Sequence, residues 1–320
     1  MNLAGYAARR AIGAVAFMLV VASITFALAR LAPGDPLGPD ALTMTADEVA
    51  TLRAELGLDR PWYIQYGRWL AGLPRLDLGR SSLYSRPVAG LVVERAANTA
   101  ILAVSALLLA TLIGIPAGRL AGADRSWPAR LVRLVSLVVL SVPPLVASLG
   151  LLAIAASTGW LPVGGMTGAG RDDGGWLADL LWHLPLPTLA LALPLAATLE
   201  RVQARAMADA ATQPFVGASR ARGRTRHDAL RLHAWPVSLA PVLGIYGVVV
   251  AALFSGSFVV EVVTSWPGLG QLLFDGLRAR DVWLVAGCGA AGALFLAVAT
   301  LGTDLLHAVV DPRTAAESSR

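Results

Sequence analysis

The sequence contains no lysine, one cysteine and four histidines, and only 15% of its 320 residues are charged. Without lysine, the chain lacks the side chain that a P-loop places on nucleotide phosphates, and the amine that Schiff-base chemistry requires. The single cysteine, Cys288, excludes an internal disulfide framework and any zinc site built from several cysteines. The histidines show no ligand spacing such as HExxH. We therefore expect no Walker-type ATPase site, no metal site and no cofactor on this chain.

What the chain does contain is apolar residues and arginine. All 26 basic residues are arginine, and with 21 acidic residues they give a net charge of +5. A pI near 10.1 is common among nucleic-acid-binding proteins. However, a hydrophobic content of 56% and a mean hydropathy of +0.64 do not fit a soluble protein of that class. The composition indicates a membrane protein in contact with a lipid bilayer, with no nucleic-acid partner.

Six segments are long and apolar enough to cross a hydrocarbon core of about 30 Å. The first is longer than the apolar region of a signal peptide and no small-x-small cleavage site follows it, so we expect an uncleaved span. Pro143 and Pro144 predict a kink in the third span, and three prolines interrupt the fourth. The predicted spans are residues 11–31, 98–118, 132–156, 181–199, 237–260 and 283–308.

The distribution of arginine predicts the orientation in the membrane. With the N-terminus inside, the inside segments hold 15 arginines and the two short outside loops hold 3. Eight more lie from Arg30 to Arg95, in an outside segment long enough to be translocated regardless of charge. The positive-inside rule therefore predicts cytoplasmic termini. The expected regions are a cytoplasmic N-terminus (1–10), an extracytoplasmic segment (32–97), a core (98–308) with a cytoplasmic loop at about 200–236, and a cytoplasmic tail (309–320).

The first outside segment is predicted to carry helices of its own. Thr45 and Glu48 form a capping box that begins a helix, which should end near Gly57. Pro61 suits the first position of a second helix. The aromatic side chains of that helix share one face, and two explanations stay open: an aromatic belt at the membrane interface, or packing onto the outer ends of the spans. These aromatic residues are Trp62, Tyr63, Tyr66 and Trp69.

The inside loop before the fifth span contains the candidate functional site. Gln213 and Pro214 can begin a short helix, and Gly223 can end it in the left-handed conformation. Small residues between them would let another protein approach closely, and the interleaved arginines would donate charged hydrogen bonds to acidic groups. From composition alone, an arginine-rich loop that only satisfies the positive-inside rule is the favoured explanation, and the docking helix is the alternative. The candidate docking residues are Gly217, Ala218, Ser219, Arg220, Ala221, Arg222 and Gly223.

Other polar residues lie near the ends of the last two spans. Residues 266–268 (Trp-Pro-Gly) predict a tight turn in front of an amphipathic segment. Glu261 and Asp304 are candidate functional acids because charges inside a membrane are costly. Structural capping or pairing explains them equally well, so their role stays open. We expect Cys288 to be a buried small hydrophobic residue and His183 to be a hydrogen-bonded polar group.

Several long motifs occur in order along the chain: TFALARLAPGDP, ELGLDRPWYIQYGRWL, LDLGRS, PFVGASRARG and FVVEVVTSWPGLGQLLFDGLRARD. In these segments the chain resembles the B-type inner-membrane permease of the dipeptide/oligopeptide/nickel class of ATP-binding-cassette importers. The resemblance implies an all-α integral membrane protein of the type I importer permease fold. It would have six transmembrane helices and a long helical extracytoplasmic segment between the first two. The docking signature of that family, EAA-x3-G, falls on residues 217–223, where Gly217 replaces the glutamate and Ser219 the second alanine.

The resemblance also implies function and partners. The chain would be a pore-forming subunit of a bacterial inner-membrane importer, without an ATPase site of its own. Its partners would be a second, C-type permease, two cytoplasmic ATP-binding subunits that hold ATP and Mg²⁺, and an extracytoplasmic solute-binding protein. Di- or oligopeptides are the expected cargo, and nickel or another metal chelate, glutathione or an opine stays open. No pore-lining residue is assigned. A sensor and an ion-driven transporter are disfavoured, since the tails are short and the span centres carry no acid.

Overall fold

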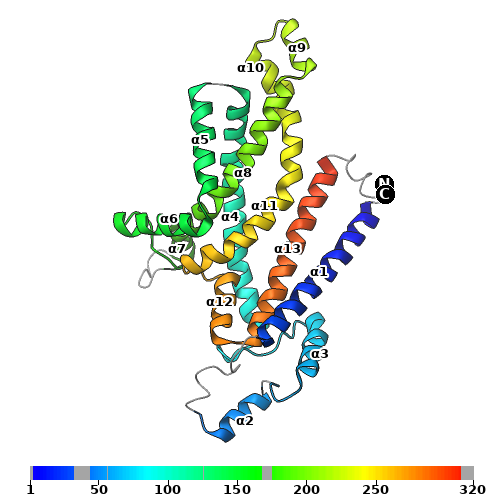
Figure 1. Cartoon of the computed structure of the whole chain (residues 1–320), viewed down its shortest axis with the longest axis vertical. Coiled ribbons are helices and arrows are strands. Elements are labelled where there is room, and N and C mark those ends of the chain that lie inside the picture. Colours follow the sequence, from blue (N-terminus) through cyan, green and yellow to red (C-terminus); the bar gives the residue numbers. More distant parts are fainter. Residues whose placement is uncertain (1–2, 32–43, 56, 125, 168–174, 311–320) are drawn as a thin grey trace. The chain divides into compact units, whose positions relative to one another are not determined.

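The computed structural model describes residues 3–31, 44–55, 57–124, 126–167 and 175–310, with side chains from residue 9 to residue 303. Within these ranges, helices are the only regular secondary structure besides one isolated bridge between Arg80 and Pro87, which agrees with the predicted all-α class (Figure 1). The helices are α1 (Leu3–Leu31), α2 (Ala46–Glu55), α3 (Trp62–Gly72), η2 (Leu73–Arg75), α4 (Val88–Ala123), α5 (Trp127–Ser141), α6 (Pro144–Thr158), α7 (Gly175–His183), α8 (Pro185–Ala211), α9 (Pro214–Ala221), α10 (Arg226–Ala229), η3 (Leu230–Ala234, a π-helical turn), α11 (Trp235–Val263), α12 (Leu269–Ala279) and α13 (Val282–Val310).

The chain divides into two compact units. We call Ile101–Thr264 with Ala299–Arg320 the α8 unit, and Asn2–Ala100 with Ser265–Val298 the α3 unit. Two long helices, α4 and α13, contribute residues to both units. The predicted docking residues lie in the α8 unit, and the predicted extracytoplasmic segment lies in the α3 unit.

Long apolar helices provide the predicted membrane spans. In the described part of the chain, four are long and apolar enough to cross a membrane: Arg9–Leu31, Val88–Ala123, Arg226–Val263 and Val282–Thr303. Two bent helix pairs, α5 with α6 and α7 with α8, raise this number to six if each pair is one span. Six spans therefore agree with the prediction only when each bent pair is counted once.

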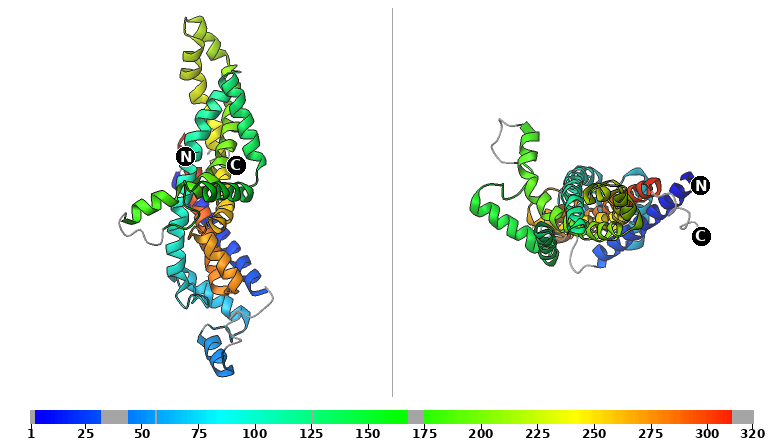
Figure 2. Two further views of the ribbon diagram at one scale, coloured as in Figure 1. Left: turned by 90° about the vertical axis from the view of Figure 1, so that its left-hand side faces the viewer. Right: turned by 90° about the horizontal axis from the view of Figure 1, so that it is seen from above.

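The kink expected at Pro143 and Pro144 is a complete break. The axes of α5 and α6 differ by 104°, and α6 leaves the direction of α5 in both Figures 1 and 2. Proline has no backbone N–H for the helical hydrogen bonds and disfavours helical geometry in the residue before it. Val142 accordingly adopts an extended conformation at the end of α5. A single kinked helix over 132–156 is therefore wrong.

The fourth predicted span is longer than the sequence suggested. The α7 and α8 axes differ by 42° at Leu184, and α8 begins with Pro185 in its first turn. From there α8 continues to Ala211, so the first part of the loop predicted at about 200–236 is helical. The hydroxyl of Thr198 donates to the carbonyl of Pro194, 2.9 Å away, near the proline inside this helix. The predicted docking residues thus follow closely on the end of a long helix.

A row of glycines brings α4 against the backbone of α8. The three glycines lie four residues apart on one face of α4. A Cβ atom on Gly118 would lie only 2.6 Å from the carbonyl oxygen of Glu200, so no larger side chain fits there. Small residues at this spacing are typical of closely packed membrane helices. The close approaches are Gly114 to Ala196, Gly118 to Glu200 and Gly122 to Ala204.

The α3 unit contains both predicted helices of the first outside segment. The backbone N–H of Thr45 donates to Glu48 Oε2 at 2.8 Å, and the N–H of Glu48 donates to Thr45 Oγ1 at 3.4 Å. This reciprocal pair is the predicted capping box. The helix ends at Glu55, and Gly57 has φ +66°, as expected for a glycine after a helix. Pro61 is the N-cap of α3 and not its first residue.

The aromatic side chains of α3 divide between packing and exposure. Tyr66 and Trp69 pack on Phe26 of α1, with ring centroids 5.4 and 5.7 Å from the Phe26 ring. Trp62 and Tyr63 are 60% and 59% exposed and contact each other edge to face. Packing onto a span therefore explains the second half of the helix. An interfacial position remains the prediction for Trp62 and Tyr63 only.

The remaining predicted polar features are also placed. Gly268 donates to the carbonyl of Trp266 at 2.7 Å, forming the expected turn before α12. Cys288 is buried, and His183 Nδ1 lies 2.8 Å from the carbonyl oxygen of Asp179. Glu261 is fully buried in α11. The side chain of Asp304 lies outside the described side chains.

Candidate functional site

The predicted docking residues form a short helix with defined ends. In α9, Gln213 is the N-cap and Pro214 occupies the first position, as the sequence predicted. Gly223 has φ +86°, and its N–H donates to the carbonyl of Arg220 at 2.9 Å. The N–H of Arg224 donates to the carbonyl of Ser219 at 3.4 Å. This pair of bonds is a Schellman motif, which requires the left-handed residue that glycine supplies.

One face of α9 is buried and the other is exposed. Val216 and Ser219, three residues apart, are 5% and 0% exposed and point inward. Val216 belongs to an apolar cluster with Met207 and Leu230, so α9 is fixed to both α8 and η3. Of the seven predicted docking residues, Ser219 is therefore a packing residue. The six on the exposed face are Gly217, Ala218, Arg220, Ala221, Arg222 and Gly223.

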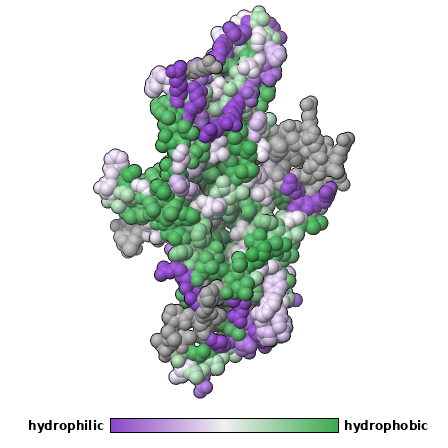
Figure 3. Space-filling view, in the orientation of Figure 1, coloured by the Kyte–Doolittle hydropathy of each residue, from purple (hydrophilic) through white to green (hydrophobic). Residues whose placement is uncertain are grey.

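The exposed face carries uncompensated positive charge. Arg220, Arg222 and Arg224 are exposed, and no hydrogen bond or ion pair within the described part of the chain engages their side chains. Figure 3 shows hydrophilic residues gathered around α9 and α10, next to the apolar surface of the helices that lead to them. Arginine side chains with no partner in their own chain are suited to bind carboxylates of another protein.

A second short helix anchors α9 to the end of α4. Thr225 is the N-cap of α10, and its Oγ1 accepts a hydrogen bond from the N–H of Asp228 at 3.1 Å. This places Arg226 so that its Nη2 donates to the carbonyl oxygen of Ala123 at 2.9 Å. Sequence reasoning missed this helix, although Thr225 and Asp228 have capping-box spacing. The partner of Arg226 carries no local sequence signal because it lies 103 residues away.

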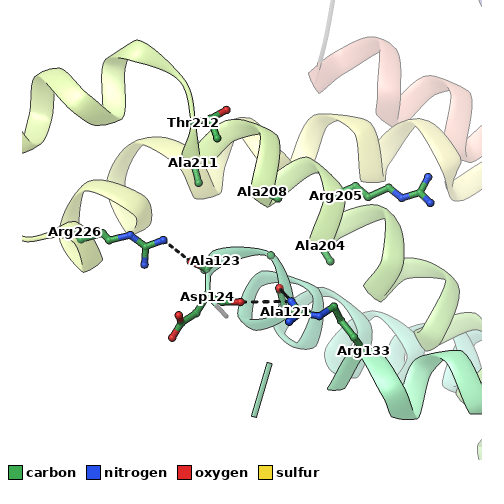
Figure 4. A pocket seen from close by; sticks show the side chains of 11 residues that line it. Ala121, Ala123, Asp124, Arg133, Ala204, Arg205, Ala208, Ala211, Thr212 and Arg226 are labelled. Carbon is green, nitrogen blue, oxygen red and sulfur yellow. Dashed lines mark hydrogen bonds between the residues drawn. The ribbon is translucent and has the colours of Figure 1, made fainter. Parts of the chain in front are cut away.

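Two arginines from different helices bind the last turn of α4 (Figure 4). Arg226 reaches it from α10, while Arg133 of α5 donates to the carbonyl of Ala121 and lies 3.5 Å from that of Asp124. The last carbonyls of a helix have no partner within the helix and carry partial negative charge, so guanidinium groups suit them. Both arginines line a cavity of about 640 Å³ beside the small residues of α8. Those small residues are Ala204, Ala208 and Ala211.

A further contact joins α4 to α11. The guanidinium carbon of Arg119 lies 5.1 Å from the ring centroid of Trp235, which is the first residue of α11. The segment 213–226, which contains the predicted docking residues, therefore connects to α8 and α11 through the chain and to α4 through the side chain of Arg226. Among the residues that the structure describes, no group of three or more His, Cys, Asp or Glu residues could hold a metal ion. The site offers surfaces for binding a protein.

Comparison with known proteins concerns the chain as a whole. Residues 114–316 match the family of binding-protein-dependent transport system inner membrane components, and residues 3–103 match the N-terminal region of such membrane components. The chain is 35% identical over 313 residues to a Brucella abortus (strain 2308) protein whose name describes a peptide transport system permease, covering 95% of this chain and 97% of that one.

Two further relatives also match over nearly their whole length. The oligopeptide transport system permease protein AppB of Bacillus subtilis is 31% identical over 318 residues, covering 97% of this chain and 99% of that one. The glutathione transport system permease protein GsiC of Salmonella paratyphi A is 30% identical over 313 residues, covering 96% and 97%. The chain belongs to the family of binding-protein-dependent transport system inner membrane components and is an inner-membrane permease of an ATP-binding-cassette importer.

Proposed function

We propose that this chain is the B-type permease subunit of a peptide importer and that α9 is the helix on which a cytoplasmic ATP-binding subunit docks. The observation that carries the docking role is the geometry of α9. It is a short helix with one face packed on α8 and η3, a glycine-closed end and an exposed face with unpaired arginines. A rigid, basic projection of this kind fits a groove lined by acidic residues.

Peptides are the cargo best supported by the relatives. Proteins named for peptide, oligopeptide and glutathione transport match the chain at 30–35% identity over nearly its full length. Because glutathione is itself a modified tripeptide, all three names describe small peptide-like solutes. Glutathione is the second candidate cargo, favoured by the Salmonella relative.

The remaining subunits follow from the importer class. We infer a C-type permease as the other half of the pathway, two ATP-binding subunits inside and a solute-binding protein outside. ATP and Mg²⁺ would be bound by the ATP-binding subunits, since the present chain has no lysine for a P-loop and would have no ATPase activity. Both termini would be cytoplasmic, as the arginine distribution predicts.

The proposed mechanism uses the attachment of α9 to long helices. Closure of the ATP-binding subunits would move α9, and α8 would carry that movement from Ala211 toward Pro185 because the helix is continuous. The pathway opens outward only if the ATP-bound partner contacts α9 better in that conformation. The rigid ends of α9 matter for this reason, since a frayed helix would absorb the movement.

Reconstitution tests the function and the cargo together. Proteoliposomes with both permeases and the ATP-binding subunits should take up dialanine only with ATP and the cognate binding protein. Parallel uptake of glutathione and of nickel would identify the alternative cargoes. Uptake of nickel without peptide uptake would contradict the peptide assignment.

Charge reversal tests the docking surface. The double variant Arg220→Glu with Arg222→Glu should lower co-purification of the ATP-binding subunits, because like charges would then face acidic groups. Arg231→Glu is the control, since Arg231 is an exposed arginine of the same loop outside α9. Equal co-purification with the unchanged chain, the double variant and Arg231→Glu would contradict docking through Arg220 and Arg222.

A further inference from the structure

The α3 unit contains a cavity whose wall carries charges of both signs. Its volume is about 280 Å³, and it lies among the end of α2, the middle of α3, the segment 77–80 and Trp283 of α13. Three arginines and two acids line it. A cavity of this size is smaller than a typical drug-binding pocket and suits a ligand of few atoms. The charged lining residues are Arg60, Arg68, Arg80, Glu55 and Asp77.

Two buried polar side chains of the same wall lack hydrogen-bond partners. The amide nitrogen of Gln65 donates to the carbonyls of Arg60 at 2.6 Å and Leu58 at 3.4 Å, which fixes Oε1 as the remaining acceptor. Neither Gln65 Oε1 nor the indole N–H of Trp69 has a partner in the described part of the chain. Gln65 is 1% and Trp69 3% exposed. Buried polar groups are rarely left unpaired, so an acceptor and a donor here point to a missing ligand.

The charged side chains that line the cavity also have hydrogen-bonding atoms that no described residue uses. Arg60 and Arg68 are exposed, and no side-chain bond to either is found among the described residues. Arg80 donates through one nitrogen to the carbonyl of Ser85 at 2.9 Å, and Asp77 Oδ1 accepts from the N–H of Gly79 at 3.2 Å. The remaining guanidinium nitrogens and the second oxygen of Asp77 are left for a ligand.

We propose that this cavity binds a small zwitterion, an amino acid or short peptide with a free carboxylate and a free ammonium group. The carboxylate needs several N–H donors, which the arginines and Trp69 supply. The ammonium needs oxygen acceptors, which Gln65, Glu55 and Asp77 supply. A simple anion would leave the acids unused, and a simple cation would meet three arginines. The site is separate from α9 and depends neither on ATP nor on the assigned cargo.

Equilibrium binding tests the site without transport. The full-length chain with its C-type partner is placed in nanodiscs, without binding protein or ATP-binding subunits, and titrated with radiolabelled L-alanyl-L-alanine. We expect one saturable site per chain. N-acetyl-dialanine and dialanine amide, which each lack one charge, should bind about tenfold more weakly, as the loss of one charged pair predicts.

Variants locate the binding. Arg68→Gln and Trp69→Phe should each weaken dialanine binding by about tenfold, because one removes a guanidinium and the other only the indole N–H. Arg75→Gln is the matched control, since Arg75 is exposed in η2 and does not line the cavity. Co-purification of the partner permease shows that each variant is folded.

Three results would overturn the proposal: no saturable binding of dialanine, equal binding of the blocked derivatives, or binding unchanged in both Arg68→Gln and Trp69→Phe. If the cavity residues were protected from hydrogen exchange by the solute-binding protein, and dialanine did not bind, the occupant would be a protein segment and the proposal would be overturned. None of these results bears on the importer assignment, because uptake and ATP hydrolysis are not measured.

Discussion

The guanidinium of Arg226 donates a hydrogen bond to the carbonyl oxygen of Ala123 across 2.9 Å, joining α10 to the last residue of α4. Only residues 222–225 separate α10 from α9. We expect a displacement of α9 to reach α4 through this charge-assisted bond and through the apolar cluster of Val216, on which Ala123 packs, in addition to passing along the chain into α8 and α11. This bond distinguishes Arg226 from Arg220, Arg222 and Arg224, whose side chains have no such contact among the described residues.

Removing the hydrogen bond between Arg226 and Ala123 should uncouple α10 from α4. We expect Arg226→Gln to lower ATP-driven uptake by about tenfold, since a hydrogen bond to a charged group contributes about 1.5–3 kcal/mol. ATP hydrolysis by the assembled importer should fall less, because the docking face of α9 is intact. The ratio of solute transported to ATP hydrolysed in proteoliposomes measures the effect. Arg231→Gln is the control, since Arg231 is exposed and lies outside α9, and an equal loss in both variants would indicate a general charge effect.

Two glycines of the docking segment should respond oppositely to alanine. Gly217 lies inside α9, and no atom lies within 4 Å of the place that an added Cβ would take, so Gly217→Ala should stabilise the helix by about 0.5–1 kcal/mol. Gly223 has φ +86°, and Gly223→Ala should destabilise the segment by about 1–2 kcal/mol. Hydrogen exchange of residues 214–223 measures both. The same sign of change in the two variants would contradict the helix end described for Gly223.

A larger residue at Gly223 should abolish coupling without preventing insertion. Gly223→Trp combines the left-handed conformation with a bulky side chain at the end of the docking helix. We expect the variant to reach the membrane in normal amounts and to lose ATP-driven uptake. Normal uptake, with normal stimulation of the ATPase, would show that this end of α9 does not seat against a partner.

The contact between α4 and α8 at Gly118 should not tolerate the methyl group that alanine would add. A Cβ atom on Gly118 would lie 2.6 Å from the carbonyl of Glu200, so Gly118→Ala should destabilise the protein by about 1–3 kcal/mol. The control is Gly90→Ala in the same helix, where no atom lies within 4 Å of the added carbon. Thermal unfolding in detergent measures both variants. A midpoint for Gly118→Ala equal to that of Gly90→Ala would mean that the helices separate at little cost.

Helix α2, which begins at the capping box of Thr45 and Glu48, should become less stable in acid. Hydrogen bonds from the backbone and side chain of Thr45 hold the pKa of Glu48 below its ordinary value. A lowered pKa in the folded state means that the stabilisation is present above the ordinary glutamate pKa of about 4.3 and is lost as the pH falls through the lower, folded value. Hydrogen exchange of residues 46–55 should therefore accelerate in that window. Glu48→Gln should remove the pH dependence, while Glu55→Gln should retain it.

Local chain geometry was the part that the sequence predicted well. Gln213, Pro214 and Gly223 bound a helix for reasons of backbone conformation alone, and the same holds for the capping box at Thr45. These features depend on residues at most a few positions apart, so a single sequence contains them. The spacing of the α4 glycines is also a local feature, but it was not among the predictions, and it does not identify the partner helix.

Long-range geometry could not be predicted in the same way. Pro143 and Pro144 mark where α5 ends, but the angle of 104° depends on what α6 packs against. The burial of Ser219 depends on how α9 lies on its neighbours, which its own residues do not determine. The bond between Arg226 and Ala123 depends on the tertiary fold, as do the unpaired atoms of Gln65 and Trp69.

The glycine contact between α4 and α8 restricts how the α8 unit can move. Over about two helical turns, backbone carbonyls of α8 and the side-chain bases of Leu199, Gln203 and Met207 lie so close to the three glycines of α4 that an added Cβ atom would clash with them. A slide along the helix axis would bring larger residues of α4 against these atoms, so we expect α4 and α8 to move together. We expect bending to occur instead at the two proline-marked breaks in the helices, between Ser141 and Pro144 and between His183 and Pro185. The close contact at the three glycines of α4 therefore predicts where the helices of this permease can bend.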